Sequence, residues 1–432
     1  MKDGHIIVIG AGITGLASAA ALSKRGRKVT VLEASERPGG RIRRLTRHGD
    51  SVEVGAQGIH SNYKEMLSLI NQVGLQSELM PLQGKVSFLD RSGSLRIPDR
   101  DLGVIKLMNA RGVRNFSWFA ARYIAFAKRF PQFEISRDIP SYDDVSAEDA
   151  FSWAGDDFHD FLLRPMMHAM TNTTLSDTSL YHAINSMRLA LSTKVFGLRT
   201  GIVTLAERLA SSVSVQYSNS AAQILTTGAR VDGVLLEDGR ILKCDHVIVA
   251  CPIEAAAKIL PDELSVAKEF LYECPSAPFV LVYFFLDRPV SSEAYVYMGH
   301  PYRDVVFNMA INHSRKAPYM VPSGKAIISA WSSYPSSTNL FFQTDDAVVS
   351  QALRDMEAFF PGISGWVDEA RVIRHSWGIA RYVPGAYRKI LEFKRHAQTL
   401  EGISFAGNDY DGVHMEAGVR SGQRAARRAC EG

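Results

Sequence analysis

The sequence predicts an α/β protein: a parallel sheet with helices on both faces, and an inserted α+β domain with a mixed sheet. Three observations predict this fold class. Residues 5–9 form a largely apolar, β-branched run, typical of a parallel strand buried on both faces. A glycine-rich turn, an Ala-rich helical stretch and a second strand follow directly, which completes a β-α-β unit. A length of 432 residues favours two or three domains.

The turn after the first strand reads Gly10-Ala-Gly12-Ile-Thr-Gly15, and residues 16–25 have helical spacing. Gly10 permits a tight turn, Gly12 lets the backbone approach a pyrophosphate, and Gly15 lets the helix pack closely on the strand. The amino terminus of the helix then faces the phosphates, because its free N–H groups and partial positive charge bind anions. This order of elements predicts a Rossmann-type dinucleotide site.

The second strand, residues 28–32, ends in Glu33. A carboxylate at this place accepts hydrogen bonds from both ribose hydroxyls and repels a 2′-phosphate, so NADP is disfavoured. NAD and FAD both remain open at this point of the chain.

A Gly39-Gly40-Arg41 loop follows Glu33, and a short strand then leads into Gly55-Ala-Gln57. A nicotinamide dehydrogenase has no need of such a loop, whereas a longer, extended dinucleotide does. The segment resembles the family of flavin-containing amine oxidases, protoporphyrinogen oxidases and phytoene-type desaturases. The resemblance implies that Gly40 and Arg41 contact the cofactor, with Arg41 near the FAD phosphates. It also implies that three residues lie beside the flavin ring: Gly55, Ala56 and Gln57.

The carboxy-terminal part of the chain carries a second match to the same family. Residues 403–409 read as a strand that ends in Gly407, an amide and Asp409, and a Gly-rich stretch and a helix from Met415 follow. The resemblance implies that Asp409 bonds the ribityl or phosphate region of FAD, and that the helix starting at Met415 points backbone N–H groups at the flavin. A helix amino terminus there stabilises the negative charge of a reduced ring. In the family, the strand that ends at Val215 lies by the adenine.

These matches are discontinuous along the chain. We therefore expect an FAD-binding domain assembled from residues 1–80, 195–270 and 395–432. Residues 81–194 and 271–394 are expected to form the substrate domain, with strands near 275–289 and 324–332 and a helix near 345–359.

The resemblance also bears on the reaction. FAD is expected to be non-covalent, because residues 382–387 hold no cysteine that could bond the flavin. Where amine oxidases of the family have a lysine near the flavin N5 atom, this chain has Phe279, and His414 stands where a tyrosine of the amine cage would be. We expect His414 to act as a base at neutral pH and Tyr387 to line the pocket.

Three functions stay open from the sequence. The first is an FAD oxidase or dehydrogenase that takes hydride from an amine or from a conjugated, apolar substrate, with reoxidation by O₂ or another acceptor. The second is an NAD-dependent dehydrogenase, which leaves the carboxy-terminal motif without a purpose. The third is a flavoprotein that isomerises a substrate without net oxidation.

Composition adds expectations about location and partners. The net charge of +4 gives no reason to expect a nucleic-acid partner. The four cysteines lack metal-site spacing, and no signal sequence or membrane span is evident, so we expect a cytoplasmic protein without metal. A small-molecule substrate is the expected partner, while a peripheral membrane contact and a homodimer stay open. The membrane contact is suggested by an aromatic helical stripe flanked by cations, for which core packing is favoured: Phe116, Phe119, Tyr123, Phe126 and Phe130.

Overall fold

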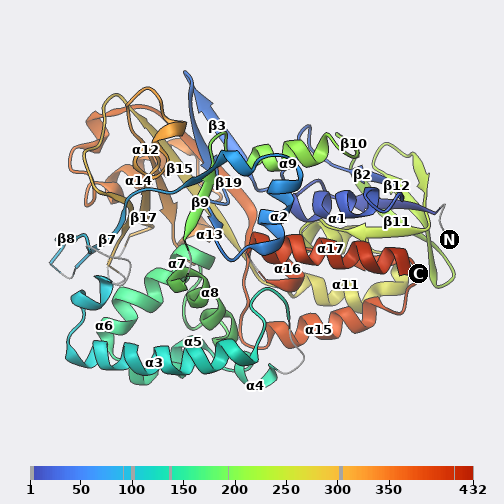
Figure 1. Ribbon diagram of the computed structural model, residues 1–432, viewed down its shortest axis with the longest axis horizontal. Helices are drawn as coiled ribbons and strands as arrows, with labels where there is room; N and C mark the ends of the chain where they lie inside the picture. The colour runs from blue at the N-terminus through green and yellow to red at the C-terminus, as the bar shows by residue number, and fades with distance from the viewer. Residues whose placement is uncertain are drawn as a thin grey trace.

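A five-stranded parallel sheet forms the centre of one half of the molecule (Figure 1). The computed structural model describes residues 4–90, 92–98, 103–135, 139–192, 194–300, 305–412 and 414–431. Distant segments of the chain meet in this sheet, in the order β10-β2-β1-β14-β20. Their bounds are β1 His5–Ile9, β2 Lys28–Leu32, β10 Ser214–Gln216, β14 His246–Val249 and β20 Ile403–Phe405. The predicted α/β fold with a Rossmann-type sheet is confirmed.

Alternating side chains of β1 belong to two different cores, because successive residues of a strand point to opposite faces. Ile6 and Val8 pack into one cluster, and Ile7 and Ile9 pack into the other. The first face is covered by α1 Ile13–Ser23, α2 Lys64–Gln72, α9 Val203–Ala210 and α17 Met415–Glu431. The second is covered by α10 Ile253–Ile259, α11 Ser265–Tyr272, α15 Ala386–Ala397 and a sheet of β11 Ala221–Thr227, β12 Arg230–Leu236 and β13 Ile241–Lys243.

The first and the last long helices, α1 and α17, lie side by side in Figure 1. Two glycines of α17 make this contact close. A Cβ atom at Gly422 would overlap the carbonyl oxygen of Thr14 in α1, and one at Gly418 would lie 2.7 Å from the Thr14 hydroxyl. The Gly-rich stretch after Asp409 therefore serves helix packing, which brings the two predicted cofactor motifs together.

A seven-stranded mixed sheet forms the other half, in the order β19-β15-β18-β17-β16-β7-β8. Only β16 and β7 pair in parallel among its described neighbours. On β15, Val282 and Phe284 pack under helix α14, whereas Leu281 and Tyr283 face Val54. The bounds are β7 Lys85–Leu89, β8 Leu95–Arg96, β15 Ser276–Leu286, β16 Ala294–Met298, β17 Phe307–Asn312, β18 Ile327–Ser332, β19 Val367–Ala380 and α14 Asp345–Met356.

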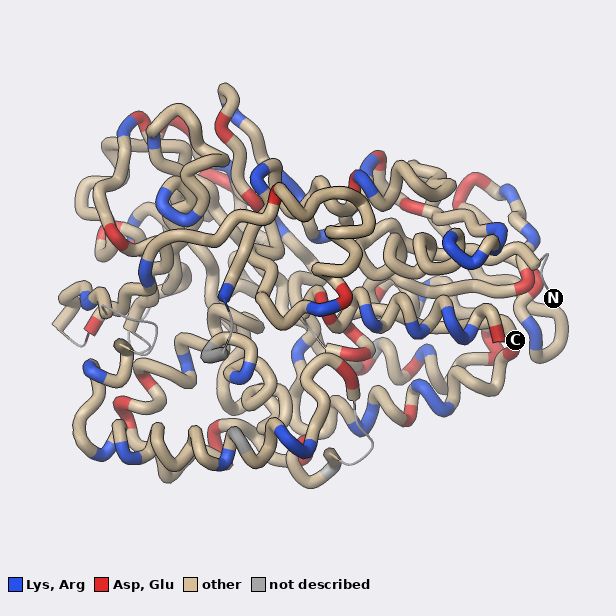
Figure 2. The backbone as a smooth tube through the Cα atoms, viewed as in Figure 1, with Lys and Arg blue, Asp and Glu red and all other residues tan. Residues whose placement is uncertain are grey.

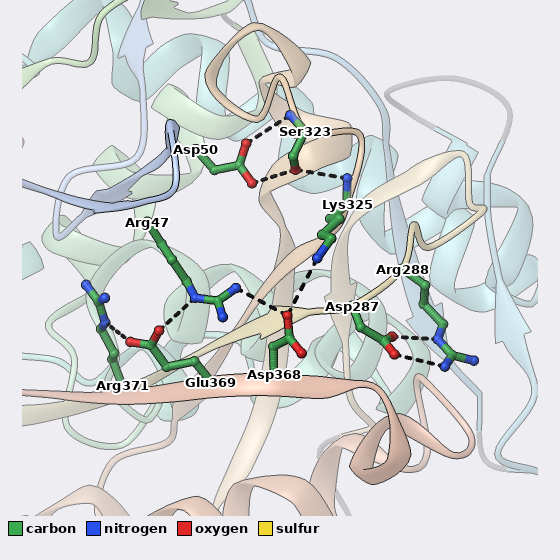
Figure 3. Close-up of polar contacts among 9 residues, drawn as sticks. All are labelled: Arg47, Asp50, Asp287, Arg288, Ser323, Lys325, Asp368, Glu369 and Arg371. Atoms are coloured by element: carbon green, nitrogen blue, oxygen red, sulfur yellow. Dashed lines mark hydrogen bonds and ion pairs between the residues drawn. The ribbon is translucent and has the colours of Figure 1, made fainter.

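A hairpin of β3 Arg43–Arg47 and β4 Asp50–Val54 joins the two halves through charged contacts (Figure 3). Arg47 Nε lies 2.7 Å from Glu369 Oε2 of β19, and the Arg47 guanidinium stacks 5.7 Å from the Phe285 ring centre. At the hairpin turn, Asp50 accepts a hydrogen bond of 2.6 Å from the Ser323 hydroxyl.

A helical layer lies below the mixed sheet in Figure 1, around α3 Ala110–Arg129 and α8 Leu180–Ser192. The aromatic stripe of α3 is core, as favoured: Phe119, Phe126 and Phe130 are buried, and Phe126 and Phe130 pack against Tyr181 of α8. No helix within the described ranges is long and apolar enough to cross a membrane. Smaller elements include α4 Pro140–Asp143, α5 Ala147–Ala150, α6 Asp156–Phe158, α7 Arg164–Thr171, β5 Ile59–His60, β6 Leu79–Pro81 and β9 Val195–Leu198.

Candidate cofactor and substrate site

The loop between β1 and α1 has the backbone geometry that each of its glycines permits. Gly10 has φ +106°, in the region that favours glycine, and its N–H bonds the Leu32 carbonyl at 2.8 Å. At Gly15 a Cβ atom would overlap the Gly10 carbonyl oxygen. At Gly12, by contrast, no described atom lies within 4 Å of the position that a Cβ atom would take. The loop is therefore packed behind Gly15 and open in front of Gly12, at the amino terminus of α1.

The Gly39-Gly40 loop lies directly against this first loop. The Gly39 N–H donates to the Ala11 carbonyl at 2.8 Å. Gly40 has φ +56°, and a Cβ atom there would lie 3.5 Å from the Gly12 Cα atom. Arg41 leaves this double loop and donates from Nη1 to the Gly378 carbonyl of β19 at 2.9 Å. The Gly39-Gly40 loop is thus brought beside Gly12, and Arg41 follows it directly.

Glu33 is held at the carboxyl end of β2 by several donors. Its Oε2 accepts from Ala11 N at 2.7 Å, and its Oε1 accepts from the N–H and the hydroxyl of Ser35. The neighbouring strand β10 places Val215 opposite Val31 of β2. The predicted ribose and adenine positions therefore adjoin each other at the same edge of the sheet.

Asp409 and Asp411 lie two residues apart in α16 Asn408–Asp411, and their surroundings differ. Asp411 lies 2.6 Å from Lys394 Nζ and 2.9 Å from Arg424 Nη2. Burial by itself would raise the pKa of Asp411, but these two cations hold the pKa below its ordinary value. Figure 2 shows the acidic and basic stretches side by side where α16 meets α17.

Asp409 is equally buried, but only one of its two carboxylate oxygens accepts a hydrogen bond. Its Oδ2 accepts from Ile253 N at 3.1 Å, whereas its buried Oδ1 has no hydrogen-bond partner in the described part of the chain. Arg41 Nη2 is the nearest cation, at 3.8 Å from that oxygen. Asp409 also borders a cavity of about 110 Å³. A buried, unsatisfied carboxylate oxygen is costly and therefore points to a ligand that donates a hydrogen bond, such as a ribityl hydroxyl. Gly407, just before α16, donates its N–H to the Ser421 hydroxyl at 3.0 Å.

The Gly55-Ala56-Gln57 segment passes next to Arg41. Gly55 has φ +84°, and a Cβ atom there would overlap the Arg41 carbonyl oxygen. Gln57 Nε2 donates back to the carbonyls of Glu53 and Gly55, and Gln57 Oε1 accepts from Lys316 Nζ at 2.6 Å. The side chain of Gln57 is therefore fixed, and Ala56 packs against the core of the parallel-sheet half.

His414 and Met415 lie at the amino terminus of α17, where the His414 carbonyl accepts from Gly418 N at 3.2 Å. The His414 ring is buried and meets the Phe133 ring edge-on at 6.3 Å. Burial, with smaller contributions from His182 and His60, holds the pKa of His414 well below its usual value. The imidazole is therefore neutral near pH 7.

Tyr387 is placed in the aromatic core of α8 and α15 and is 3% exposed. Its hydroxyl lies 2.9 Å from His182 Nδ1, and its ring stacks on Tyr382 at 4.6 Å. Tyr387 is thus packed within this aromatic core, beside His182.

Phe279, which the sequence comparison with the family expects at the place of a lysine, lies on β15 next to Gly378 and meets Trp331 edge-on at 5.2 Å. This wall continues through Leu281 to Val54, the last residue before Gly55. The side chains of β15 and β4 in this cluster are therefore apolar and buried.

Sequence reasoning missed three buried charged residues. Glu416 accepts from the backbone N–H groups of Glu65 and Met66 at 3.0 Å each, and so caps α2. Glu53 and Lys316 lie beside Gln57, and both are buried. The position of Glu53 between two valines of a strand could have indicated a buried glutamate. Nothing in the local sequence indicates that Lys316 is buried.

A parallel sheet with two interlocked glycine loops at its carboxyl edge is the arrangement of a Rossmann-type nucleotide-binding fold. The chain belongs to the flavin-containing amine oxidoreductase family, whose model matches residues 13–430. It is 22% identical to coproporphyrinogen III oxidase of Bacillus subtilis (strain 168), over 98% of both chains. Its fold is similar to that of a putrescine oxidase bound to putrescine, with TM-score 0.83, 17% identity, and 100% and 99% of the two chains covered. It is also similar to a fatty acid isomerase of P. acnes that produces CLA, with TM-score 0.75, 16% identity and 99% of both chains covered.

Proposed function

We propose that the protein binds FAD non-covalently and removes hydride from a C–H bond of an organic substrate. The observation that carries this proposal is the junction of three distant segments. Gly40 lies against Gly12, Arg41 follows Gly40 directly, and Arg41 Nη2 lies 3.8 Å from the unsatisfied Oδ1 of Asp409. An anion-binding loop, a cation and a hydroxyl-binding oxygen in this order fit an extended dinucleotide.

The residues that would hold FAD follow from this order. Glu33 would bind the ribose, with Val215 beside the adenine, and Gly10, Gly12, Gly15, Gly40 and Arg41 would surround the pyrophosphate. Gly407 and Asp409 would hold the ribityl chain, and Gly55, Ala56, Gln57 and Met415 would border the ring. When bound, FAD supplies the acceptor atom for a hydride and passes the electrons on to O₂ or another acceptor.

Between the two substrate classes, the apolar wall favours a conjugated, largely apolar molecule over an amine. Phe279 and Trp331 offer no charge to an ammonium group, which would lose its hydration without compensation. The full-length similarity to a coproporphyrinogen III oxidase supports the same preference. His414 is the proposed base: its neutral imidazole accepts a proton from the substrate as hydride leaves the adjacent C–H bond.

The test is anaerobic reduction of the protein-bound flavin by a panel of amines, porphyrinogens and polyenes. We expect a yellow protein that releases intact FAD on acid denaturation and is bleached by a porphyrinogen or a polyene. Bleaching by amines alone would overturn the substrate preference. Substrate turnover without bleaching would identify an isomerase. A colourless protein that takes up NAD but no FAD would overturn the proposal that FAD is the cofactor.

The role of His414 has its own test. We expect His414→Ala to keep FAD bound and to slow flavin reduction by roughly 10²-fold, the usual contribution of a general base. Stopped-flow absorbance with the best substrate of the panel measures this rate. His396→Ala, at the carboxyl end of α15, is the matched control and should leave the rate unchanged. An unchanged reduction rate in His414→Ala would remove this residue from the mechanism.

A further inference from the structure

Behind Gln57, a buried lysine and a buried glutamate lie close to each other without a direct contact. Lys316 is 2% exposed, and its Nζ donates to Gln57 Oε1 at 2.6 Å. Glu53 is 4% exposed, and its Oε1 accepts from Ile202 N at 2.6 Å. The second oxygen of Glu53 has no hydrogen-bond partner in the described part of the chain. The ammonium group is thus bonded toward Gln57 and not to the carboxylate.

Burying both charges is expensive, and each stabilises the other. Burial raises the pKa of Glu53 against the attraction of Lys316, and burial lowers the pKa of Lys316 against the attraction of Glu53. Tyr283 of β15 holds the backbone of Glu53 through a 3.0 Å hydrogen bond from its hydroxyl to the Glu53 carbonyl. His313, in the same short helix as Lys316, stays neutral because burial and the lysine lower its pKa. The charged pair is therefore rigid and shielded from water, where its field acts over a longer range than at a surface.

We propose that Lys316 is a positioning residue for the flavin: its ammonium fixes Gln57 and places a buried positive charge beside the Gly55–Gln57 segment, which raises the reduction potential of bound FAD. This rests on the proposed function, in which FAD lies along that segment. The physical reason is that reduction adds negative charge to the ring, and a nearby buried cation stabilises the reduced form more than the oxidised form. The same charge repels a substrate ammonium, in agreement with an uncharged, conjugated substrate.

The alternative is that Lys316 and Glu53 only hold β4 against α12 His313–Lys316. A purely structural pair would change stability when broken and leave the flavin potential alone. The bonding pattern argues against that role, because a stabilising ion pair would be expected to close the contact between the two charges and to satisfy both carboxylate oxygens.

The experiment measures the midpoint potential of bound FAD, by anaerobic reduction against reference dyes at neutral pH, together with the Kd for FAD. We expect Lys316→Met to shift the potential to a more negative value and Lys316→Arg to retain most of the wild-type value. Glu53→Gln should shift it in the opposite direction at a pH above about 7, where the Glu53 carboxylate, whose pKa burial raises to about 7, carries its negative charge. Lys325→Met is the matched control: Lys325 is about half exposed and pairs with Asp368 on the outer surface, so its removal should leave the potential unchanged.

Folded Lys316→Met protein that binds FAD with the wild-type potential would overturn the proposal. Should Lys316→Met not fold, the isosteric Glu53→Gln variant decides: a positive shift supports the proposal and an unchanged potential overturns it. Wild-type protein that takes up no FAD would instead refute the proposed function, so the two failures are distinguishable.

Discussion

Two halves of the molecule, one around the parallel sheet and one around the mixed sheet, are held together by different kinds of contact. Around β1, the decisive contacts join backbone atoms, as where Gly39 N meets the Ala11 carbonyl. Around β15, the decisive contacts join side chains from distant elements, as where Lys316 meets Gln57 or where Phe279 meets Trp331. Backbone contacts demand particular residue types at fixed spacing, whereas side-chain contacts depend on how strands far apart in the chain are placed. The contacts of the parallel-sheet half therefore follow from the local sequence. The contacts of the mixed-sheet half follow only from the three-dimensional arrangement of distant segments.

The largest effect expected from this difference is at the paired glycines of the first loop. Gly15→Ala forces a Cβ atom onto the Gly10 carbonyl oxygen, where backbone must move, and should destabilise the fold by more than about 4 kcal/mol. Gly12→Ala adds the same methyl group where no described atom lies within 4 Å. It should keep the melting temperature of the FAD-free protein and weaken FAD binding by roughly tenfold or more, equivalent to about 1.4 kcal/mol.

Thermal unfolding of the FAD-free proteins and fluorescence titration with FAD separate these two outcomes. If Gly12→Ala lowered stability as much as Gly15→Ala, the contrast between the two glycines would be wrong. Gly12 would then be required for folding and not for binding a ligand.

The same contrast explains what the sequence could and could not predict. The strands β1 and β2 lie at the predicted residues 5–9 and 28–32, because apolar runs next to glycine turns are local signals. Helix α1 begins at Ile13, before the predicted residue 16, since the last residues of the glycine loop already form its first turn. Gly12 came from the dinucleotide fingerprint, whereas Arg41 and Asp409 came from the family resemblance and lie 3.8 Å apart.

The contacts on the substrate side had no such local signal. Lys316 reaches Gln57 only because the register of the mixed sheet places α12 behind β4. Likewise, the position of Tyr387 within an aromatic core depends on how α15 packs against α8. Single-sequence patterns predict which residues are buried, but a buried polar contact also requires the partner, which lies hundreds of residues away.

An intermediate effect is expected at Asp411, which belongs to the parallel-sheet half but depends on side-chain partners. Asp411→Asn leaves Lys394 and Arg424 without their shared carboxylate and should destabilise the protein by about 3 kcal/mol, the lower end for a broken buried pair. Chemical denaturation at neutral pH measures the loss. Lys389→Met is the control, because Lys389 and its partner Glu273 are both more than half exposed, and it should change stability little.

The pH dependence of this variant follows from the lowered pKa of Asp411. A depressed pKa in the folded state gives stability that is fully present above the unfolded-state pKa of about 3.9 and is lost as the pH falls through the folded-state value. The difference between wild type and Asp411→Asn should therefore stay constant from neutral pH down to about pH 5 and shrink only below about pH 4. A difference that already shrank between pH 7 and pH 6 would contradict the assignment of the shift to this carboxylate.

The smallest effect is expected at the seam where the β3–β4 hairpin of one half meets β19 of the other (Figure 3). Arg47→Ala removes ion pairs with Glu369 and Asp368 and one of the two guanidinium groups that stack on Phe285. Because the network is largely at the surface, the loss should be about 1 kcal/mol or less and should decrease at high salt. Melting curves at low and high ionic strength measure this loss.

Arg288→Ala is the control for the seam, since the ion pair of Arg288 in Figure 3 is with its chain neighbour Asp287 and does not join the two halves. It should leave the melting temperature unchanged. An Arg47→Ala loss that persisted at high salt would locate the contribution of Arg47 in its packing on Phe285 instead of in its charge. The two halves would then be joined at this seam by side-chain packing, as within the mixed-sheet half, and not by salt-sensitive surface ion pairs.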